Sequence, residues 1–478
     1  MHTNGSYVNG FWVEGGEHRE NVNPSDTDDI IGAFARTNTD VLDDAVDAAR
    51  SALPGWSMTS PQTRANLLEA VAAEIFADAR KLGELLAREE GKTLGEAIGE
   101  VTRAAQIFRF FSGEALRMRG ERQPSTRDGV YVNIHREPVG VVGIITPWNF
   151  PIAIPAWKSA PALAYGNTVV MKPAELVSAS AHALAEIIDR VGFPPGVFNL
   201  VTGAGSVLGD ALSSHEGVDA LTFTGSGEVG RKVAMSATAR LAKVQLEMGG
   251  KNPLIVAADA DLDIAVDCAI QGAYFSTGQR CTASSRLIVE DSVHDEFVER
   301  MLSRMAVLRI GDALDASTDI GPVVDQRQLD TDLRYLEIAR ATAGSTVHGG
   351  ERVERKTPGF YLTPALITGA LNGDRVSREE VFGPVASVIT VASYDEAVEV
   401  ANDTLFGLVA GICTTSLAQA EDYQRRSDTG MVMVNLPTAG VDPHVPFGGR
   451  KSSSYGPHEQ GSHAQEFFTQ GKTAYVRP

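Results

Sequence analysis

VVGIITPWNF (141–150), NTVVMKP (167–173), SASAHALAEIIDRVG (178–192), VFNLVTG (197–203) and DALTFTG (219–225) are the segments that decide the fold. Four of these five segments are short runs rich in β-branched residues and predict strands, whereas residues 178–192 predict a helix. Strands that alternate with helices in this way are typical of a parallel, doubly wound sheet. The sequence therefore predicts an α/β domain.

The same alternation extends outward from these segments. Residues 40–118 predict helices, because their apolar residues recur at spacings of three and four. Strand-like and helical runs resume after residue 250, which predicts a second α/β domain. Residues 121–140 predict a projecting hairpin and residues 465–477 an exposed strand, and such free edges need a partner, for example another subunit.

The composition is that of an acidic globular protein. The 478 residues include 61 acidic and 42 basic side chains, a formal net charge of −19. This charge repels phosphate backbones and anionic lipids, so neither nucleic acid nor membrane is an expected partner. The sequence contains no charged leader and no apolar stretch of the roughly 18–20 residues that span a bilayer, which predicts a cytoplasmic protein. Three cysteines without metal-ligand spacing predict neither a disulfide framework nor a metal site.

The segment FSTGQRCTASSR (275–286) places Cys281 among small polar residues instead of in an apolar run. A loop cysteine of this kind can be reached by a substrate, and we expect the neighbouring Arg280 to favour its nucleophilic thiolate form. The spacing alone is equally compatible with an unreactive structural thiol. Cys268 and Cys413 lie in apolar runs and are predicted to pack in the core as small hydrophobic residues.

Two further segments carry candidate catalytic groups. In VQLEMGGKNP (244–253), Glu247 ends a predicted strand directly before a Gly-Gly turn, a position that suits a general base at the edge of an α/β sheet. In ITPWNFP (145–151), Asn149 lies between aromatic residues in a turn, where its amide could stabilise an oxyanion. A solvated glutamate and a turn-forming asparagine are the alternatives that the sequence leaves open.

FTGSGEVG (223–230) suggests a nucleotide site. Its glycines have the G-x-G-x-x-G spacing between a predicted strand and a predicted helix, where a helix N-terminus can receive a phosphate. A standard Rossmann site also needs an acidic residue about 20 positions further on, and only Glu247 is available there. The fingerprint is therefore incomplete. MKPAE (171–175) and EEVFGP (379–384) add charged and aromatic residues that, taken alone, are more typical of surface charge or of a core aromatic.

Taken together, these motifs resemble those of the aldehyde dehydrogenase superfamily. PWNFP, KPAE, FTGS, LEMGGKNP, GQRC, EEVFGP and PFGGRKSS occur in the order of that family, and the resemblance runs from NGFWVEGG to the KTAYV tail. The longer segments KVQLEMGGKNP and STGQRCTASSRLIVE are similar to the α-ketoglutarate semialdehyde (2,5-dioxopentanoate) dehydrogenase branch. The resemblance implies NAD(P)-dependent oxidation of an aldehyde to a carboxylate.

The resemblance also implies an α/β architecture of three parts. A dinucleotide-binding domain with an atypical Rossmann fold would comprise residues 1–120 and 141–247, and a catalytic domain would comprise residues 248–446. A small β element for oligomerisation would comprise residues 121–140 and 447–478. Exchange of strands through this element would join the chain into a homodimer or homotetramer.

Carried onto the matching positions, the resemblance assigns chemistry to three residues. Cys281 would attack the aldehyde carbon to form a thiohemiacetal, Asn149 would stabilise the oxyanion, and hydride transfer would leave a thioester. Glu247 would activate the water that hydrolyses this thioester. No metal ion takes part in the implied reaction. The residues assigned to cofactor binding are Trp148, Lys172, Glu175, Gly225, Ser226, Glu380 and Phe382.

Cofactor choice, proton relay and substrate depend on single residues. Glu175 would bind the ribose hydroxyls of NAD and repel the 2′-phosphate of NADP, so we expect NAD, with NADP permitted. Some family members carry a further carboxylate near the C-terminus that relays protons, and the alignment of Ser462 with it puts that relay in doubt. A semialdehyde acid needs a clamp for its carboxylate, and the candidate side chains are Arg280 and Arg109.

Other functions make different demands on these residues. Succinate semialdehyde, or a broad range of aldehydes, is an alternative substrate for the same chemistry. A cofactor-independent cysteine hydrolase or acyltransferase would need a histidine base, and none of the ten histidines lies in a comparable segment. A catalytically silent protein of the same fold would be expected to lack the nucleophile or the base, yet Cys281, Glu247 and Asn149 are all present.

Overall fold

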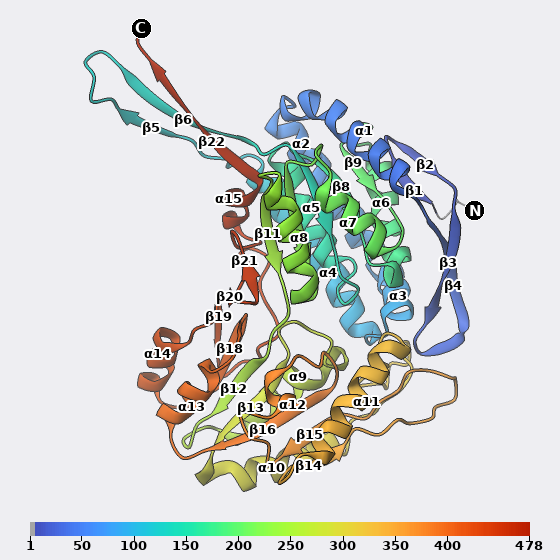
Figure 1. Cartoon of the computed structure of the whole chain (residues 1–478), viewed down its shortest axis with the longest axis vertical. Coiled ribbons are helices and arrows are strands. Elements are labelled where there is room, and N and C mark those ends of the chain that lie inside the picture. The colour runs from blue at the N-terminus through green and yellow to red at the C-terminus, as the bar shows by residue number, and fades with distance from the viewer. Residues whose placement is uncertain (1–4) are drawn as a thin grey trace.

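The computed structural model describes residues 5–478, which form two large sheets, a three-stranded projecting sheet and two two-stranded sheets (Figure 1). In spatial order, the first sheet consists of β2 (Phe11–Val13), β1 (Ser6–Val8), β9 (Phe198–Leu200), β8 (Thr168–Lys172), β7 (Val141–Ile145), β10 (Ala220–Thr224), β11 (Lys243–Glu247) and β21 (Ser454–Tyr455). The strands from β9 to β11 are parallel, and antiparallel strands close both edges. The predicted parallel sheet is therefore confirmed.

Successive side chains of a strand point to opposite faces of a sheet. Both faces of this sheet carry apolar side chains, and helices cover both of them. In β7, Val142 and Ile144 pack into one apolar cluster, and Val141 and Ile145 pack into another. The helices of the first cluster include α2 (Pro61–Ala77), α3 (Ala79–Glu90), α4 (Leu94–Glu114), α5 (Ala153–Ala164), α6 (Ser178–Val191) and the short α15 (Gln465–Phe468). Those of the second are α1 (Thr39–Ser57), α7 (Asp210–Ser214) and α8 (Gly227–Ala239). The helices predicted over residues 40–118 are thus present.

The second sheet is the α/β unit predicted after residue 250. In spatial order it consists of β14 (Thr346–Gly349), β15 (Ala365–Thr368), β16 (Val385–Val391), β13 (Ser284–Glu290), β12 (Asn252–Val256), β18 (Val409–Cys413) and β19 (Met431–Val434). Only the edge strand β14 is antiparallel to its neighbour. Its helices are α9 (Leu262–Tyr274), α10 (Asp291–Met305), α11 (Gln326–Ala341), α12 (Arg375–Arg378), α13 (Tyr394–Asn402) and α14 (Leu417–Arg426). Cys268 and Cys413 are buried in one apolar cluster here, as predicted.

A three-stranded arm extends away from the two large sheets and ends near the C-terminus (Figure 1). It consists of β22 (Thr469–Val476), β6 (Tyr131–Pro138) and β5 (Glu121–Pro124), with β6 in the middle. β22 pairs along its whole length with β6, from Thr469 opposite Pro138 to Val476 opposite Tyr131. The predicted hairpin and C-terminal strand are both confirmed, and the outer edges of β5 and β22 carry no further strand within the described residues.

Two pairings go beyond the sequence prediction. The N-terminal strands β3 (Glu17–Asn23) and β4 (Asp26–Arg36) form a hairpin of their own. β21 lies in the predicted oligomerisation element, yet it pairs with β11 so that Ser454 lies opposite Glu247. The C-terminal segment therefore reaches the edge of the first sheet where the candidate base lies. The predicted domain boundaries stay a prediction.

The connection between the two large sheets is short, because β11 ends at Glu247 and β12 begins at Asn252. The segment between them contains the predicted Gly-Gly turn at residues 249–250. None of the helices in the described part of the chain is long and apolar enough to cross a membrane. Because the connection between β11 and β12 is short, we expect the candidate site where the two large sheets approach each other.

Candidate active site

Two cavities meet at Cys281. The larger cavity has a volume of about 380 Å³ and the smaller cavity a volume of about 260 Å³. Cys281, Trp157 and Phe447 line both of them. The larger cavity continues along the ends of β10 and β11, and the smaller cavity continues along α4. A molecule in either cavity can therefore contact Cys281.

The backbone that leads to Cys281 has an unfavourable conformation. Ser276, Thr277 and Gly278 have φ angles of +51°, +56° and +67°, in the left-handed region that side chains disfavour. Glu96 of α4 stabilises this turn by accepting hydrogen bonds from the Ser276 amide (2.8 Å) and hydroxyl (3.0 Å). Backbone strain of this kind concentrates at functional sites in proteins, which favours Cys281 as the reactive cysteine.

The surroundings of Cys281 do not favour its thiolate. Burial, together with the nearby carboxylates of Glu247 and Glu380, raises the pKa of the Cys281 thiol to about 12. The expectation that Arg280 promotes the thiolate is wrong, because its guanidinium is hydrogen-bonded to Glu96 (2.9 Å) and to the Ser276 hydroxyl. Formation of the nucleophile therefore needs a proton acceptor.

Asn149 is buried on the loop that connects β7 to α5. Its side-chain amide donates to the backbone oxygen of Gln279, two residues before Cys281, at 3.0 Å. Its own backbone oxygen accepts a hydrogen bond from Lys92 Nζ at 2.7 Å. Lys92 in turn pairs with Glu100, and the Glu100 carboxylate accepts hydrogen bonds from two backbone amides at the start of α5. The predicted oxyanion donor is therefore held beside the nucleophile from two sides.

Glu247 lies at the end of β11 with its side chain buried in the larger cavity. The Ser454 hydroxyl of β21 donates to its carboxylate at 2.6 Å. Burial raises the pKa of Glu247 well above its ordinary value, and the negative charge of Glu459 acts in the same direction. A carboxylate with a raised pKa is a stronger base, which suits the role predicted for this residue.

Glu459 is a buried site residue that the sequence analysis missed. Its carboxylate accepts a hydrogen bond from Lys158 Nζ and lies 3.3 Å from the Thr222 hydroxyl, while its second oxygen has no partner among the described residues. Ser462, which was aligned with the relay carboxylate, is exposed three positions further on. Hydrogen bonds between the backbones of Glu459 and Phe447 fix the position of Glu459. No pattern among neighbouring residues marks the pairing of Phe447 with Glu459, so the sequence alone did not single out Glu459.

Five of the seven predicted cofactor residues line the larger cavity: Trp148, Gly225, Ser226, Glu380 and Phe382. Ser226 is the N-cap of α8, so the N-terminus of this helix opens on the cavity, where a phosphate is favoured. The rings of Trp148 and Phe382 lie edge to face with centroids 5.4 Å apart. Glu380 accepts a hydrogen bond from the Gly250 amide at 2.9 Å. A side chain on the preceding Gly249 would overlap this carboxylate. The residues present thus fit a dinucleotide.

Lys172 and Glu175 do not line the larger cavity, although Leu176 does. The Glu175 carboxylate is ion-paired with Arg19 of β3 at 3.1 Å and with Arg36 of β4 at 2.8 Å. Burial lowers the pKa of Lys172 to about 8. Two guanidinium groups offset the charge of Glu175, so repulsion by this carboxylate does not by itself exclude a 2′-phosphate.

The two arginines that were predicted to bind substrate lie in different places. Arg109 reaches neither cavity, because its half-exposed side chain pairs with Glu69 at 3.0 Å and packs over the ring of Phe76. The structure gives no support to its predicted contact with substrate. Arg280 lines the smaller cavity, but its guanidinium is ion-paired with Glu96. Lys92 and Arg103 are further cations in this cavity that the sequence analysis did not single out.

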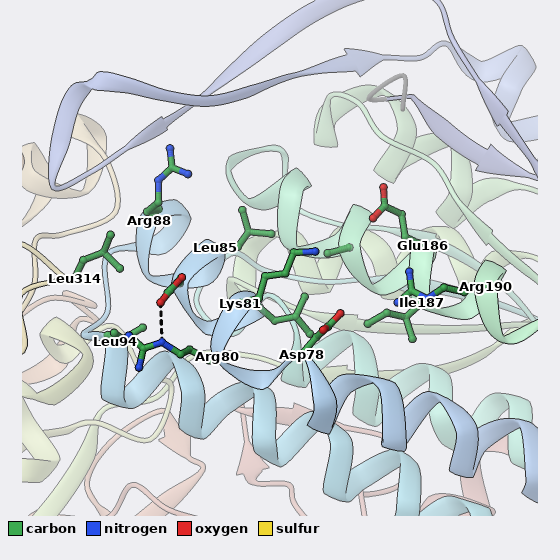
Figure 2. A pocket seen from close by; sticks show the side chains of 13 residues that line it. Asp78, Arg80, Lys81, Leu85, Arg88, Leu94, Glu186, Ile187, Arg190 and Leu314 are labelled. Carbon is green, nitrogen blue, oxygen red and sulfur yellow. Dashed lines mark hydrogen bonds and ion pairs between the residues drawn. The ribbon is translucent and has the colours of Figure 1, made fainter. Parts of the chain in front are cut away.

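A third hollow, of about 480 Å³, lies between α3 and α6 away from Cys281 (Figure 2). Charged side chains of both signs surround it, and three of its cations are ion-paired: Arg80 with Glu84, Arg88 with Asp29 and Arg190 with Glu74. Its lining, as far as the chain is described, contains neither a cysteine nor a histidine. The groups suited to catalysis therefore gather at the two cavities beside Cys281.

Known proteins resemble this chain over nearly its whole length. The model of the "Aldehyde dehydrogenase family" matches residues 12–474. The chain is 42% identical to an α-ketoglutaric semialdehyde dehydrogenase of Bacillus subtilis, over 99% of this chain and 98% of the relative. It is 41% identical to an α-ketoglutarate semialdehyde dehydrogenase of Haloferax volcanii, over 98% of each chain. It is 37% identical to a 2,5-dioxopentanoate dehydrogenase of Saccharolobus solfataricus, over 97% of each chain.

Solved structures confirm the predicted fold class. A betaine aldehyde dehydrogenase from Staphylococcus aureus in complex with NAD+ superimposes with a TM-score of 0.97 at 34% identity, over 99% of this chain and 95% of the other. A structure described as a putative aldehyde dehydrogenase from Burkholderia cenocepacia gives a TM-score of 0.96 at 37% identity, over 100% and 98% of the two chains.

Alkylation of Cys281 tests the raised pKa of its thiol. Because this pKa is about 12, the rate of reaction with iodoacetamide should rise about tenfold per pH unit from about pH 7 to about pH 10, without a plateau. Mass spectrometry of quenched samples measures the rate on the Cys281 peptide, and the Cys281→Ser variant reports labelling of the other cysteines. A plateau below about pH 8 would contradict the prediction, since it would mean a stabilised thiolate.

Proposed function

The chain belongs to the aldehyde dehydrogenase family, and from that premise we propose that it oxidises α-ketoglutarate semialdehyde to α-ketoglutarate with NAD as hydride acceptor. An NAD(P)-dependent aldehyde dehydrogenase needs its nucleophile at a point where the aldehyde can bind beside the dinucleotide. One observation carries the proposal: Cys281 lies where the two cavities meet. The choice of substrate is supported by three relatives of at least 37% identity that are named for this aldehyde.

In the first half of the proposed reaction, the Cys281 sulfur attacks the aldehyde carbon and its proton passes to Glu247. The aldehyde oxygen then carries the negative charge of a thiohemiacetal, which the Cys281 backbone amide and the Asn149 side-chain amide stabilise. One Asn149 N–H is used by Gln279, so the second is available for this oxygen. NAD, when bound, supplies the acceptor for the hydride that leaves the aldehyde carbon. Cys281 is left as a thioester.

In the second half, Glu247 takes a proton from a water molecule that attacks the thioester carbon. The C–S bond breaks, the carboxylic acid leaves, and the Cys281 thiolate takes the water proton back from Glu247 to become a thiol. The raised pKa of Glu247 makes its carboxylate an effective base for both proton transfers. We assign Glu459 and Lys158 to passing onward the proton that Glu247 received from Cys281, so that Glu247 is a carboxylate again before the water attacks. Glu459 is buried beside Glu247, and one of its oxygens has no partner among the described residues.

The cofactor residues are proposed to act in three groups. Gly225 and Ser226, at the N-terminus of α8, would bind the pyrophosphate together with Trp148. Glu380 and Phe382 would position the nicotinamide ribose and ring, and Lys172 and Glu175 would bind the adenosine ribose. NAD is supported by the structurally similar betaine aldehyde dehydrogenase, which was solved with NAD+.

The alternatives are less well supported. Succinate semialdehyde and a broad range of aldehydes would use the same chemistry, but the three relatives above carry the name of the longer keto acid. A cofactor-independent cysteine hydrolase would need a histidine base, and no histidine lines either cavity in the described part of the chain. A silent protein would be expected to lose the arrangement of Cys281, Asn149 and Glu247.

Substrate preference tests the proposed function. The kcat/KM for α-ketoglutarate semialdehyde should exceed those for succinate semialdehyde and for pentanal by about tenfold or more, a difference of about 1.4 kcal/mol in transition-state binding. The measurement is the rate of NADH formation, with the Cys281→Ser variant as the inactive control. Equal kcat/KM values for the three aldehydes would leave only a general aldehyde dehydrogenase.

Replacement of Glu459 by Gln tests the proton pathway. The negative charge of Glu459 raises the pKa of Glu247, so its removal should lower that pKa and move the acid limb of the kcat profile to lower pH. Loss of the onward proton acceptor should also lower kcat by about tenfold or more. We expect a burst of NADH followed by slow turnover, measured by stopped-flow absorbance. Ser462→Ala is the matched control, and an acid limb that stays in place in Glu459→Gln would refute the assignment.

We also propose that the chain assembles into a homodimer or homotetramer through its arm. The outer edges of β5 and β22 present unpaired backbone amides and carbonyls, which tend to pair with another chain. The exposed Tyr475 side chain lies on β22 and adds apolar surface to that edge. Pairing with a second copy would cover both features.

Truncation tests this assembly. Deletion of residues 469–478 removes β22 and exposes β6, so it should give a monomer or an aggregate by light scattering after gel filtration. Deletion of residues 477–478 alone leaves β22 intact and should leave the assembly unchanged. A monomeric full-length chain, or an unchanged oligomer after the longer deletion, would contradict the proposal.

A further inference from the structure

The proposed substrate carries a carboxylate, which needs a cationic partner in the smaller cavity. Three cations line this cavity: Lys92, Arg103 and Arg280. Lys92 lies 2.7 Å from the Glu100 carboxylate, and Arg280 lies 2.9 Å from the Glu96 carboxylate. Both of these charges are therefore already compensated within the protein.

Arg103 differs from the other two, because no carboxylate of the described residues lies within ion-pair distance of it. Its Nη atoms donate to the backbone oxygen of Val441 and to Gln460 Oε1, and both acceptors are neutral. Its Nε–H is buried and has no partner among the residues that the structure describes. A guanidinium has five N–H donors, so one N–H on each Nη atom of Arg103 is left for a ligand, besides the enclosed Nε–H. Asp442 and Glu100 act on Arg103 only from beyond ion-pair distance.

Burial of this charge is unfavourable without a ligand. The pKa of Arg103 is lowered, and removal from water is the largest cause. A bound carboxylate would offset that loss through charge-assisted hydrogen bonds, whose planar geometry matches the guanidinium. The surroundings of Arg103 therefore favour an anion.

The position of Arg103 on α4 suits the far end of a short substrate. Glu96, Gly99, Glu100 and Arg103 all line the smaller cavity, at the spacings that place residues on one face of a helix. Glu96 holds the turn before Cys281, and the rise along α4 from Glu96 to Arg103 is about 10 Å. Between them, a side chain on Gly99 would meet no atom within 4 Å, so the space is open. A short acid can extend from Cys281 toward Arg103.

Resting on the proposed function, we propose that Arg103 determines substrate specificity by binding the carboxylate of the aldehyde through two parallel N–H···O hydrogen bonds. The substrates that it selects are short aldehydes with a carboxylate or α-keto carboxylate at the end remote from the reacting carbon. Lys92 and Arg280 are part of the cavity wall, where they are ion-paired with Glu100 and Glu96. This assignment replaces Arg280 and Arg109 as the carboxylate clamp.

Variants at Arg103 test the proposal against two aldehydes, α-ketoglutarate semialdehyde and pentanal. Arg103→Gln should lower kcat/KM for the acidic aldehyde by about thirtyfold or more, because charge-assisted hydrogen bonds are lost. The value for pentanal should change by less than about threefold. Arg103→Lys keeps a positive charge without the planar fork, so its loss on the acidic aldehyde should be intermediate. Arg109→Gln is the matched control on the same helix and should affect neither aldehyde.

A binding measurement separates recognition from catalysis. Glutarate, a dicarboxylate that cannot be oxidised, should protect Cys281 from iodoacetamide in the wild-type chain and in Arg109→Gln. In Arg103→Gln the glutarate concentration needed for protection should rise by about tenfold or more. Equal losses on both aldehydes, or unchanged protection by glutarate, would overturn the role of Arg103.

The outcome also distinguishes this inference from the proposed function. If the wild-type enzyme prefers the acidic aldehyde and Arg103→Gln keeps that preference, the Arg103 assignment fails and the proposed function stands. If the wild-type enzyme shows no such preference, the proposed substrate fails and the Arg103 assignment fails with it.

Discussion

The carboxylate of Glu247 is withdrawn from water at the end of β11, and the chemistry of the site depends on how that charge is balanced. Burial and the neighbouring Glu459 raise the pKa of Glu247, whereas the Ser454 hydroxyl and the Lys158 charge lower it. The same exclusion of water raises the pKa of the Cys281 thiol. A weakly acidic thiol needs a strong base, and a buried carboxylate is one. The raised pKa of Glu247 therefore provides the strong base that the weakly acidic Cys281 thiol needs.

The groups that set the pKa of Glu247 come from segments that are far apart in the chain. The first sheet provides Glu247 at the end of β11, and residues 248–251 lead directly into the second sheet, whose strand β13 follows Cys281. The C-terminal segment returns to the first sheet through β21 and places Ser454 opposite Glu247. Backbone bonds between Phe447 and Glu459 then fix the second carboxylate. Displacement of the C-terminal segment would therefore change the pKa of the base without altering any residue of β11.

Compensation of charge also explains how the smaller cavity, where we propose that the aldehyde binds, is organised. Two of its cations, Lys92 and Arg280, are neutralised by carboxylates of α4 and act as parts of the wall. Both also stabilise neighbouring loops, since Lys92 bonds to the Asn149 backbone and Arg280 to the turn before Cys281. A cation that is used in this way has little attraction left for a substrate. Arg103, whose partners are neutral, keeps its attraction for an anion.

The sequence by itself determined the parallel α/β sheets, the strands of the arm, and the segments that carry Cys281, Glu247 and Asn149. These features depend on the periodicity of side chains along one strand or helix and on turn residues within a few positions, so a contiguous stretch of sequence contains the information. Only the tertiary structure decided which charges meet. Arg280 adjoins Cys281 in sequence but pairs with Glu96, 184 positions away, and Lys158 pairs with Glu459 across 301 positions. The partner of a buried charge is set by which distant elements pack together, and no local pattern encodes that packing.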